Sequence, residues 1–209
     1  MAPHDTQPRP MRRDAVRNHQ LVMEAARAVL AEFGTDASME LIASRAGVGV
    51  GTVYRRFPNK EALVDEIATQ ILSELADEAQ QALERGDGTG LEVFLWAVGR
   101  SMTVHHGYAD KLVGHTKAGC VEQLRDLIVE LLSQAQEFGK IGPDVTLGDI
   151  MTLVWGLRGV VETGSGVVPD AWQRHLDIHL AGLRSARLPS SLPSVSREQL
   201  TRVTAGTGR

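Results

Sequence analysis

The stretch SMELIASRAGVGVGTVYRRFPNKEAL, residues 38–63, decides the fold of this chain, because it spells two short helices, a glycine turn and the start of a third helix. Ser38 is placed to cap the first helix, and Gly47 has the backbone freedom to end it. A second helix is expected from Val50, and Pro58 prevents its continuation. Two short helices joined by a tight turn form the layout that places one helix in a groove of DNA.

The second predicted helix has two unlike faces. Val53 and Phe57 fall on one side, which we expect to be structural, whereas the other side is small, polar and basic. Glycine and threonine permit close approach to DNA, and arginine pairs with phosphate or with guanine. We expect phosphate contacts from Ser38, Thr52, Tyr54 and Lys60, and base-edge contacts from Val50, Gly51, Arg55 and Arg56.

The segment AGVGVGTVYRRFPNKEAL, residues 46–63, resembles the signature of the TetR family of bacterial transcriptional regulators, and the resemblance covers residues 13–63. It implies an all-α fold in which a three-helix helix-turn-helix DNA-binding domain precedes a helical ligand-binding and dimerisation domain. It also implies a dimeric repressor that binds a palindromic operator and is released by a small-molecule effector. Many family members carry Ser-Lys-Gly where this chain has Gly49-Val50-Gly51, which replaces a basic contact by a side chain that can read the thymine methyl group.

Charge is distributed unevenly along the 209 residues. Residues 1–60 hold nine Lys/Arg against six Asp/Glu, whereas the remainder holds 13 against 20, and the net charge is −4. This balance argues against a protein that coats nucleic acid with its whole surface, and it places the basic charge at the motif. The single cysteine, Cys120, excludes an internal disulfide. Because no apolar run resembles a membrane span or a signal peptide, we expect a cytoplasmic protein.

Composition and periodicity divide the chain into four parts. We expect a flexible basic arm at 1–12, a helix-turn-helix domain at 13–60, a helical regulatory, ligand-binding and dimerisation domain at 61–184, and a mostly disordered tail at 185–209. No convincing alternating strand pattern occurs. After the motif, hydrophobic periodicity predicts helices over residues 60–85, 91–104, 109–119, 121–138, 147–163 and 171–184.

The family resemblance implies a ligand pocket between the long helix and the last two helices, drawing on residues 91–138 and part of 147–163. The expected lining residues combine aromatic walls with a few polar tips, and they are Trp96, Met102, His106, Tyr108, His115 and Trp155. Ordinary core positions are the alternative interpretation of Trp96, Met102 and Trp155.

Pairing of two chains is expected on geometric grounds. A single helix-turn-helix domain reads about four base pairs, which are too few to specify one site in a genome. The predicted helices at 147–163 and 171–184 are apolar, and glycine permits close approach to the same helices of a second chain. We therefore predict a two-fold four-helix interface. Its expected members are Gly156, Gly159, Trp172, Leu176, Leu180 and Leu183.

No cofactor, metal site or catalytic centre is expected. His175 and His179 have the spacing that can place two imidazoles on one metal, and His105, His106 and His115 lie close in sequence, but neither set brings an obvious third ligand. The chain lacks phosphate-binding glycine loops and the common hydrolase and zinc-protease motifs, so we do not expect an enzyme. The alternative to a ligand-released repressor is a helix-turn-helix module for protein docking or DNA architecture, without an effector.

Overall fold

The computed structural model describes residues 10–105, 118–164, 166–184 and 192–206. All regular secondary structure within these ranges is helical. The predicted all-α fold is therefore confirmed. The chain divides into two compact units, residues 1–63 and 64–209, a boundary close to the predicted one at residue 60. The helix expected at 109–119 lies almost entirely outside the described residues. None of the described helices is both long and apolar enough to cross a membrane.

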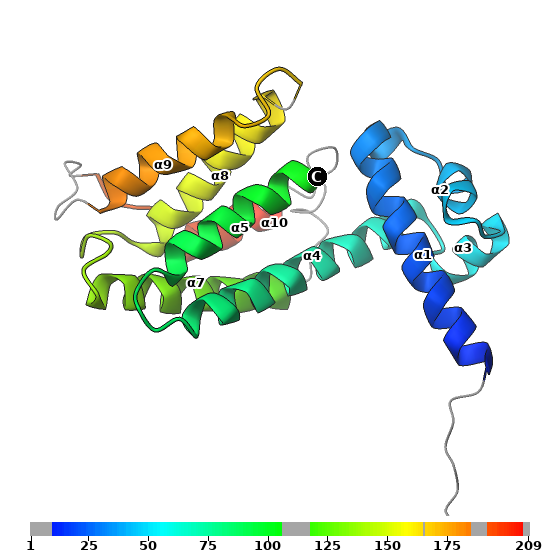
Figure 1. Cartoon of the computed structure of the whole chain (residues 1–209), viewed down its shortest axis with the longest axis horizontal. Helices are drawn as coiled ribbons and strands as arrows, with labels where there is room; N and C mark the ends of the chain where they lie inside the picture. The colour runs from blue at the N-terminus through cyan, green and yellow to red at the C-terminus, as the bar shows by residue number, and fades with distance from the viewer. Residues whose placement is uncertain (1–9, 106–117, 165, 185–191, 207–209) are drawn as a thin grey trace, which may run out of the picture. The chain divides into compact units, whose positions relative to one another are not determined.

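The first unit is a three-helix head. It contains α1 (Pro10–Phe33), the short turn η1 (Gly34–Asp36), α2 (Met39–Ala46), α3 (Val50–Arg56) and the first turn of α4 (Lys60–Leu83) (Figure 1). Residues 10–12, expected in a flexible arm, already belong to α1. The core is formed where the inner faces of the helices meet, and its fully buried members include Ala26, Val29, Leu30, Ile42, Val53 and Leu63.

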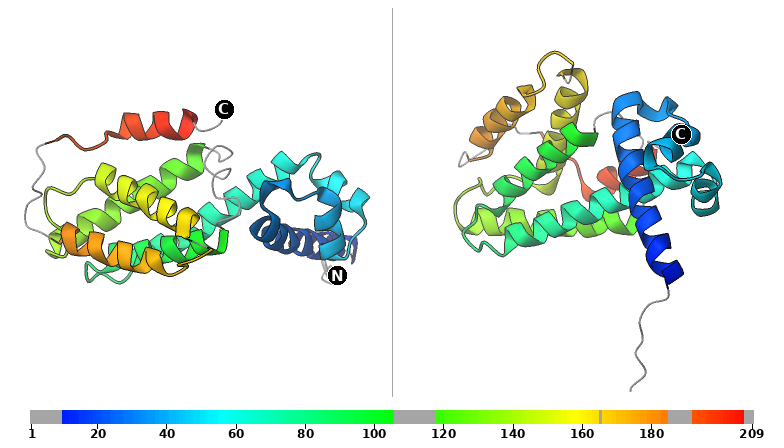
Figure 2. Two further views of the ribbon diagram at one scale, coloured as in Figure 1. Left: turned by 90° about the horizontal axis from the view of Figure 1, so that it is seen from above. Right: turned by 45° about the vertical axis from the view of Figure 1, so that its right-hand side comes forward.

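The second unit is a helical bundle. It comprises the rest of α4, then α5 (Gly90–His105), α7 (Ala118–Glu137), α8 (Leu147–Gly164), α9 (Ala171–Leu183) and α10 (Arg197–Gly206). Within it, α5 packs against α7, α8 and α9, and α8 packs against α9 (Figures 1 and 2). Leu95, Leu131 and Leu157 are almost completely buried, so one apolar core joins the middle of the bundle.

The C-terminal segment differs from the sequence prediction of a mostly disordered tail. Residues 197–206 form α10, and its Leu200 is completely buried. Arg197 pairs with Asp126 at 2.5 Å and with Glu122 at 2.9 Å, both on α7. Short helices depend mainly on tertiary packing, which composition does not reveal. The burial of Leu200 and these ion pairs hold α10 against the bundle.

The apolar stripe of α9, which was predicted to contact a partner chain, packs against the chain's own core. Trp172, Leu176, Leu180 and Leu183 are between 0% and 8% exposed in the single chain. Trp172 lies so close to Gly99 of α5 that a Cβ atom there would be 2.2 Å from its ring. Periodicity identifies the most apolar face of a helix, but it does not distinguish the chain's own core from a partner. The other two predicted interface residues, Gly156 and Gly159, are exposed.

Candidate functional site

The turn between α2 and α3 is fixed by local capping. The Ser38 hydroxyl oxygen accepts a hydrogen bond from the Leu41 backbone N–H at 3.1 Å, which caps α2 as predicted. Gly47 ends α2 with φ of 68° and ψ of 27°, in the left-handed region that side chains disfavour. Asn59 accepts a hydrogen bond from Ala62 N–H at 2.8 Å and caps α4. Ser38 and Gly47 thus fix the two ends of α2, and Asn59 fixes the start of α4.

The predicted division of α3 into an inner and an outer face is confirmed by burial. Val53 and Phe57 are 0% and 2% exposed and hold the helix to the core. A Cβ atom placed on Gly51 would meet nothing within 4 Å, so the outer face is open near the N-terminal end of α3. Thr52 is half-buried, and the remaining predicted DNA contacts of α3 are exposed: Val50, Gly51, Tyr54, Arg55 and Arg56.

Three of the four predicted phosphate contacts line one shallow depression of about 340 Å³. Ser38, Tyr54 and Lys60 meet there, beside Glu40. The Tyr54 hydroxyl donates to Glu40 Oε1 at 3.3 Å, and the Lys60 ammonium donates to the Ala37 carbonyl at 3.1 Å. Each of these side chains is thus positioned by a protein partner before any ligand binds.

Glu40 is a member of this depression that the sequence analysis did not assign. Hydrogen bonding with its own backbone, followed by the Ser38 and Tyr54 side chains, lowers the pKa of the Glu40 carboxyl below its usual range. Burial and the adjacent Glu40 charge raise the pKa of the Tyr54 hydroxyl, so Tyr54 stays protonated and can donate a hydrogen bond. The carboxylate orients Tyr54 but places a negative charge beside the expected phosphate.

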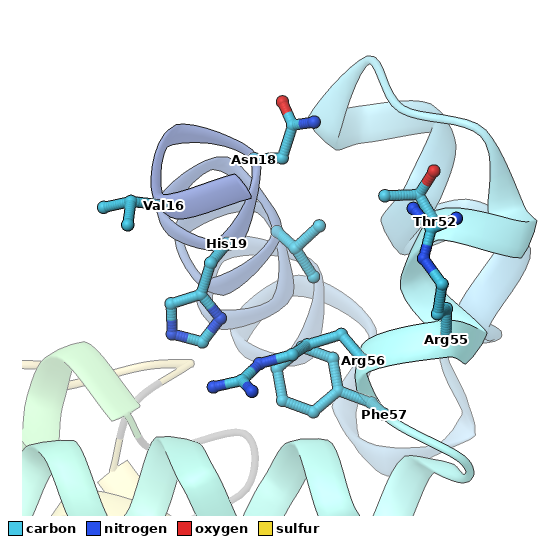
Figure 3. Close-up of a pocket in the computed structure, with 8 residues that line it drawn as sticks. Val16, Asn18, His19, Thr52, Arg55, Arg56 and Phe57 are labelled. Atoms are coloured by element: carbon cyan, nitrogen blue, oxygen red, sulfur yellow. The ribbon is translucent and has the colours of Figure 1, made fainter. Parts of the chain in front are cut away.

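A second depression, of about 410 Å³, joins α3 to α1. Thr52, Arg55 and Arg56 line it from α3, with Asn18 and His19 opposite them (Figure 3). Arginine side chains and the absence of any carboxylate among its described lining residues make this depression suitable for an anion such as a DNA phosphate.

The residues of α1 in this second depression were not predicted, although a signal was present. Asn18 and His19 precede the buried Val22 by four and three residues, so helical periodicity places them on the face of α1 that meets α3. The His19 ring stacks on Phe57 with centroids 5.9 Å apart, and the Arg56 guanidinium lies 6.0 Å from the Phe57 ring centroid. Phe57 therefore connects the two helices.

A cavity of about 190 Å³ lies in the second unit, between α4, α5, α7 and α8. Met102 and Trp155, two of the predicted ligand-binding residues, line it. Trp96 instead lies edge-on against Trp172, with ring centroids 5.4 Å apart, and is not among the described lining residues. The other three predicted residues, His106, Tyr108 and His115, lie outside the described residues.

The cavity wall is apolar except for two arginines. Its described apolar lining residues are Ala68, Ile71, Leu72, Leu75, Phe94, Val98, Met102, Val121, Leu124, Ile128, Met151, Val154 and Trp155, and its described charged lining residues are Arg125 and Arg158. An apolar pocket with a few polar groups is the usual composition of a small-molecule site. Sequence reasoning missed both arginines, although Arg125 falls four residues after Val121 and three before Ile128, on the inner stripe of α7.

Arg125 joins the cavity wall to α10. Its side chain is 2% exposed and pairs with Glu122. The guanidinium also donates to the Leu200 carbonyl at 3.1 Å and to the Thr201 hydroxyl oxygen at 3.3 Å. Hydrogen bonding from Arg197, and then the charge of Arg125, lower the pKa of the Glu122 carboxyl. The buried charge is therefore compensated by α10 and by its own helix.

Two family models match the chain, one to each unit. The model described as "Bacterial regulatory proteins, tetR family" matches residues 22–67. The model described as "Transcriptional regulator SbtR-like, C-terminal domain" matches residues 87–185. The first match includes α2, the turn and α3, and the second includes most of the cavity-lining residues.

Known proteins resemble the chain over most of its length or over about a third of it. A TetR transcription regulatory protein of Mycobacterium vanbaalenii is 33% identical, with a TM-score of 0.64 over 84% of this chain and 100% of that one. The transcriptional repressor KstR2 of Mycobacterium tuberculosis is 25% identical over 181 residues, 78% of this chain and 90% of KstR2. The transcriptional regulator YhgD of Bacillus subtilis is 46% identical over 66 residues, 31% of this chain and only 35% of YhgD.

Proposed function

Because this chain belongs to the TetR family of bacterial transcriptional regulators, we propose that it acts as a repressor of transcription. In this proposal a homodimer binds a palindromic operator, and a small-molecule effector in the cavity of the second unit releases it. The observation that carries the proposal is the exposed outer face of α3, which has an open glycine in its first turn and two arginines in its last turn. The name of the relative KstR2, a repressor, supports repression as the direction of control.

The two depressions support separate roles for phosphate contacts and base contacts on DNA. Ser38, Tyr54 and Lys60 would hold one phosphate, and Thr52 and Arg56 would reach a second one from the opposite side of α3. Between them, Val50, Gly51 and Arg55 would approach base edges in the major groove. Phosphate contacts on both sides of a recognition helix fix its register, so the base contacts can be specific.

The proposed dimer surface combines exposed stripes of α8 and α9. On α8 the stripe consists of small residues, namely Thr152, Gly156, Gly159 and Thr163. On α9, Ile178 is 59% exposed and belongs to the stripe opposite the buried leucines. The stripes adjoin, because a Cβ atom on Gly156 would lie 3.5 Å from His175 Nε2. Small residues permit close helix approach, and Ile178 supplies apolar area to bury.

The cavity supports an effector site, since Met102 and Trp155 line it among helices α4, α5, α7 and α8. Through α4, which begins in the DNA-binding unit, a change of the cavity wall could reach the head. The effector would act by binding more tightly to a conformation of the protein that does not bind DNA than to the conformation that does. The ratio of these two affinities sets how far the equilibrium between the two conformations moves.

Operator binding is tested with the DNA upstream of the protein's own reading frame and a shuffled fragment of equal length. Fluorescence anisotropy measures affinity between about 50 and 200 mM salt. We expect the natural fragment to bind at least about 10³-fold more tightly than the shuffled one. Equal affinity for both fragments would contradict an operator-binding repressor, and weak, salt-insensitive binding would favour a protein-docking module.

Arg55→Ala refines this test. It should cost about 1–3 kcal/mol on the natural fragment and much less on the shuffled one, because a guanine contact is sequence-dependent. Arg85→Ala is the matched control, since Arg85 is exposed in the second unit and pairs with Asp87. A loss of equal size on both fragments would assign Arg55 to phosphate contact instead.

A further inference from the structure

We propose that the effector is a small apolar molecule carrying one carboxylate, which Arg158 binds at the wall of the cavity. This inference rests on the proposed function and names the class of ligand at the same site. It depends on the size of the cavity, on the charge of its wall and on the partners of its two arginines.

The size of the cavity limits the apolar part of the ligand. A dry cavity of about 150 Å³, lined by leucine, isoleucine and phenylalanine, holds one benzene molecule. The cavity here measures about 190 Å³ and has a similar lining, with Ile71, Phe94 and Ile128 among its walls. It therefore suits one aromatic ring or a short alkyl chain, and not a large polycyclic compound.

The charge of the wall selects the sign of the ligand. Among the lining residues that the structure describes, Arg125 and Arg158 are cationic, and none is Asp or Glu. Both arginines already pair with carboxylates, Glu122 and Glu162, but those carboxylates are not among the described lining residues. The charged groups that line the cavity are therefore cationic, which disfavours a ligand cation and favours a ligand carboxylate. Guanidinium also offers a carboxylate two parallel hydrogen bonds.

The partners of the two arginines identify which one binds the ligand. Arg125 is committed to α10 through the Leu200 carbonyl and Thr201, so we assign it a positioning role in the wall. Arg158 pairs with Glu162 one turn along α8, at 2.5 Å, and its side chain is 23% exposed. Exposed pairs of this spacing contribute little to stability, and this pair is partly exposed. We therefore expect a ligand carboxylate to compete with Glu162 for the Arg158 guanidinium.

The test uses octanoate and its neutral counterpart octanamide as probes for the full-length protein, with isothermal titration calorimetry. Octanoate should bind more tightly than octanamide. Arg158→Gln should weaken octanoate binding by at least about tenfold and change octanamide binding by less than about twofold. Glu162→Gln should instead strengthen octanoate binding, because it removes the competing carboxylate.

The matched control is Arg202→Gln on α10. Arg202 pairs with Glu198 at the same spacing, at 2.6 Å, and its side chain is 75% exposed and absent from the cavity lining. It should leave both affinities unchanged. Thermal melting of each variant shows whether the fold is retained, and the opposite expected signs of Arg158→Gln and Glu162→Gln separate ligand binding from a general loss of structure.

Three results would overturn the inference: octanamide binding as tightly as octanoate, no binding of either probe, or unchanged octanoate affinity in Arg158→Gln. Operator affinity is measured in the same preparations. Sequence-specific DNA binding without octanoate binding would reject the ligand class and leave the repressor intact. Octanoate binding that depends on Arg158, without sequence-specific DNA binding, would reject the proposed function and retain the ligand site.

Discussion

The side-chain ammonium of Lys60, at the start of α4, donates a hydrogen bond to the backbone carbonyl of Ala37, 3.1 Å away. Ala37 immediately precedes the capping residue Ser38, so the bond ties the start of α4 to the start of α2. Lys60 also lines the depression that contains Ser38 and Tyr54. Its positive charge is therefore held at the proposed phosphate position by a structural partner, which reduces the entropy lost on binding DNA.

Lys60→Gln should separate the two roles of this side chain. Glutamine keeps a donor for the Ala37 carbonyl but removes the charge. We expect affinity for all DNA to fall by a similar factor and the slope of log affinity against log salt to decrease by about one unit. Lys60→Ala should show the same change and also lose about 1 kcal/mol of unfolding free energy. An unchanged salt slope in both variants would exclude a phosphate contact.

Gly51→Ala should change stability and DNA affinity in opposite directions. A methyl group at Gly51 meets no protein atom within 4 Å, and alanine is the better helix former, so the free energy of unfolding should rise by about 0.5–1 kcal/mol. The same methyl group would obstruct the close approach of α3 to DNA, so operator affinity should fall. Urea unfolding and anisotropy measure the two quantities.

The control for Gly51→Ala is Gly119→Ala on α7, where a Cβ atom is likewise unopposed. Because Gly119 lies in the second unit, operator affinity should not change. If Gly51→Ala bound the operator as well as the original protein, α3 would not approach DNA through this face.

The features of the head that sequence could predict are local ones. Ser38 caps the helix that follows it and Gly47 ends that helix, because both effects depend on residues a few positions apart. The inner position of Val53 and Phe57 followed from a period of 3.6 residues. The contact between Glu40 and Tyr54 could not be predicted, because it depends on the angle between two helices, which the sequence does not state.

Features that depend on distant contacts could not be predicted. Trp172 and Leu176 form an apolar stripe whether that stripe meets α5 of the same chain or a helix of another, and the structure shows that it meets the chain's own core. Trp96 was predicted to line the pocket because aromatic residues are common in pocket walls, but its ring packs on Trp172. Leu200 is a lone leucine in a polar segment, and it is buried in the folded chain, where α10 packs on α8 and forms ion pairs with α7.

Leu200→Ala should destabilise the second unit, although it lies in a segment whose composition resembles a tail. Leu200 is 0% exposed, and removing a buried leucine side chain typically costs about 2–5 kcal/mol, so we expect a loss in this range. Leu192→Ala is the control, since Leu192 is 80% exposed in the same segment, and it should cost less than about 0.5 kcal/mol. Equal effects of the two changes in urea unfolding would mean that α10 is not docked in solution.

Ile178→Asp should break the proposed dimer without unfolding the chain. Ile178 is 59% exposed, so the charged side chain costs little in the single chain, but it would be buried and unpaired in the α8–α9 interface. Light scattering at micromolar concentration should show monomer, and operator affinity should fall with it. Val203→Asp, at a residue 42% exposed on α10, should leave the dimer intact.

Trp172→Ala should lower the stability of the chain itself, whereas Ile178→Asp should weaken only the dimer. Because Trp172 is 4% exposed and packs on Gly99, its truncation should cost about 3–5 kcal/mol of stability rather than act on dimerisation alone. A dimer that survives Ile178→Asp would place the interface elsewhere on the bundle.

Acidification should destabilise the fold through His175. Its ring centroid lies 4.2 Å from that of His179, and its Nε2 is buried without a hydrogen-bond partner. Burial, and then the charge of His179, lower the pKa of His175 below its usual value of 6.5. The unfolded chain therefore binds a proton at His175 at a higher pH than the folded chain does. Stability contributed by the neutral ring is lost as pH falls through 6.5, and the loss levels off below the folded pKa.

Thermal melting at about pH 7.5 and pH 5.5, at one fixed protein concentration, measures this loss. His179→Gln removes the neighbouring charge, so the pKa of His175 should rise towards 6.5 and the drop in Tm between the two pH values should become smaller. His175→Gln should reduce the drop further, because it removes the titrating group itself. A drop in Tm that is equal in all three proteins would show that other groups cause the acid sensitivity.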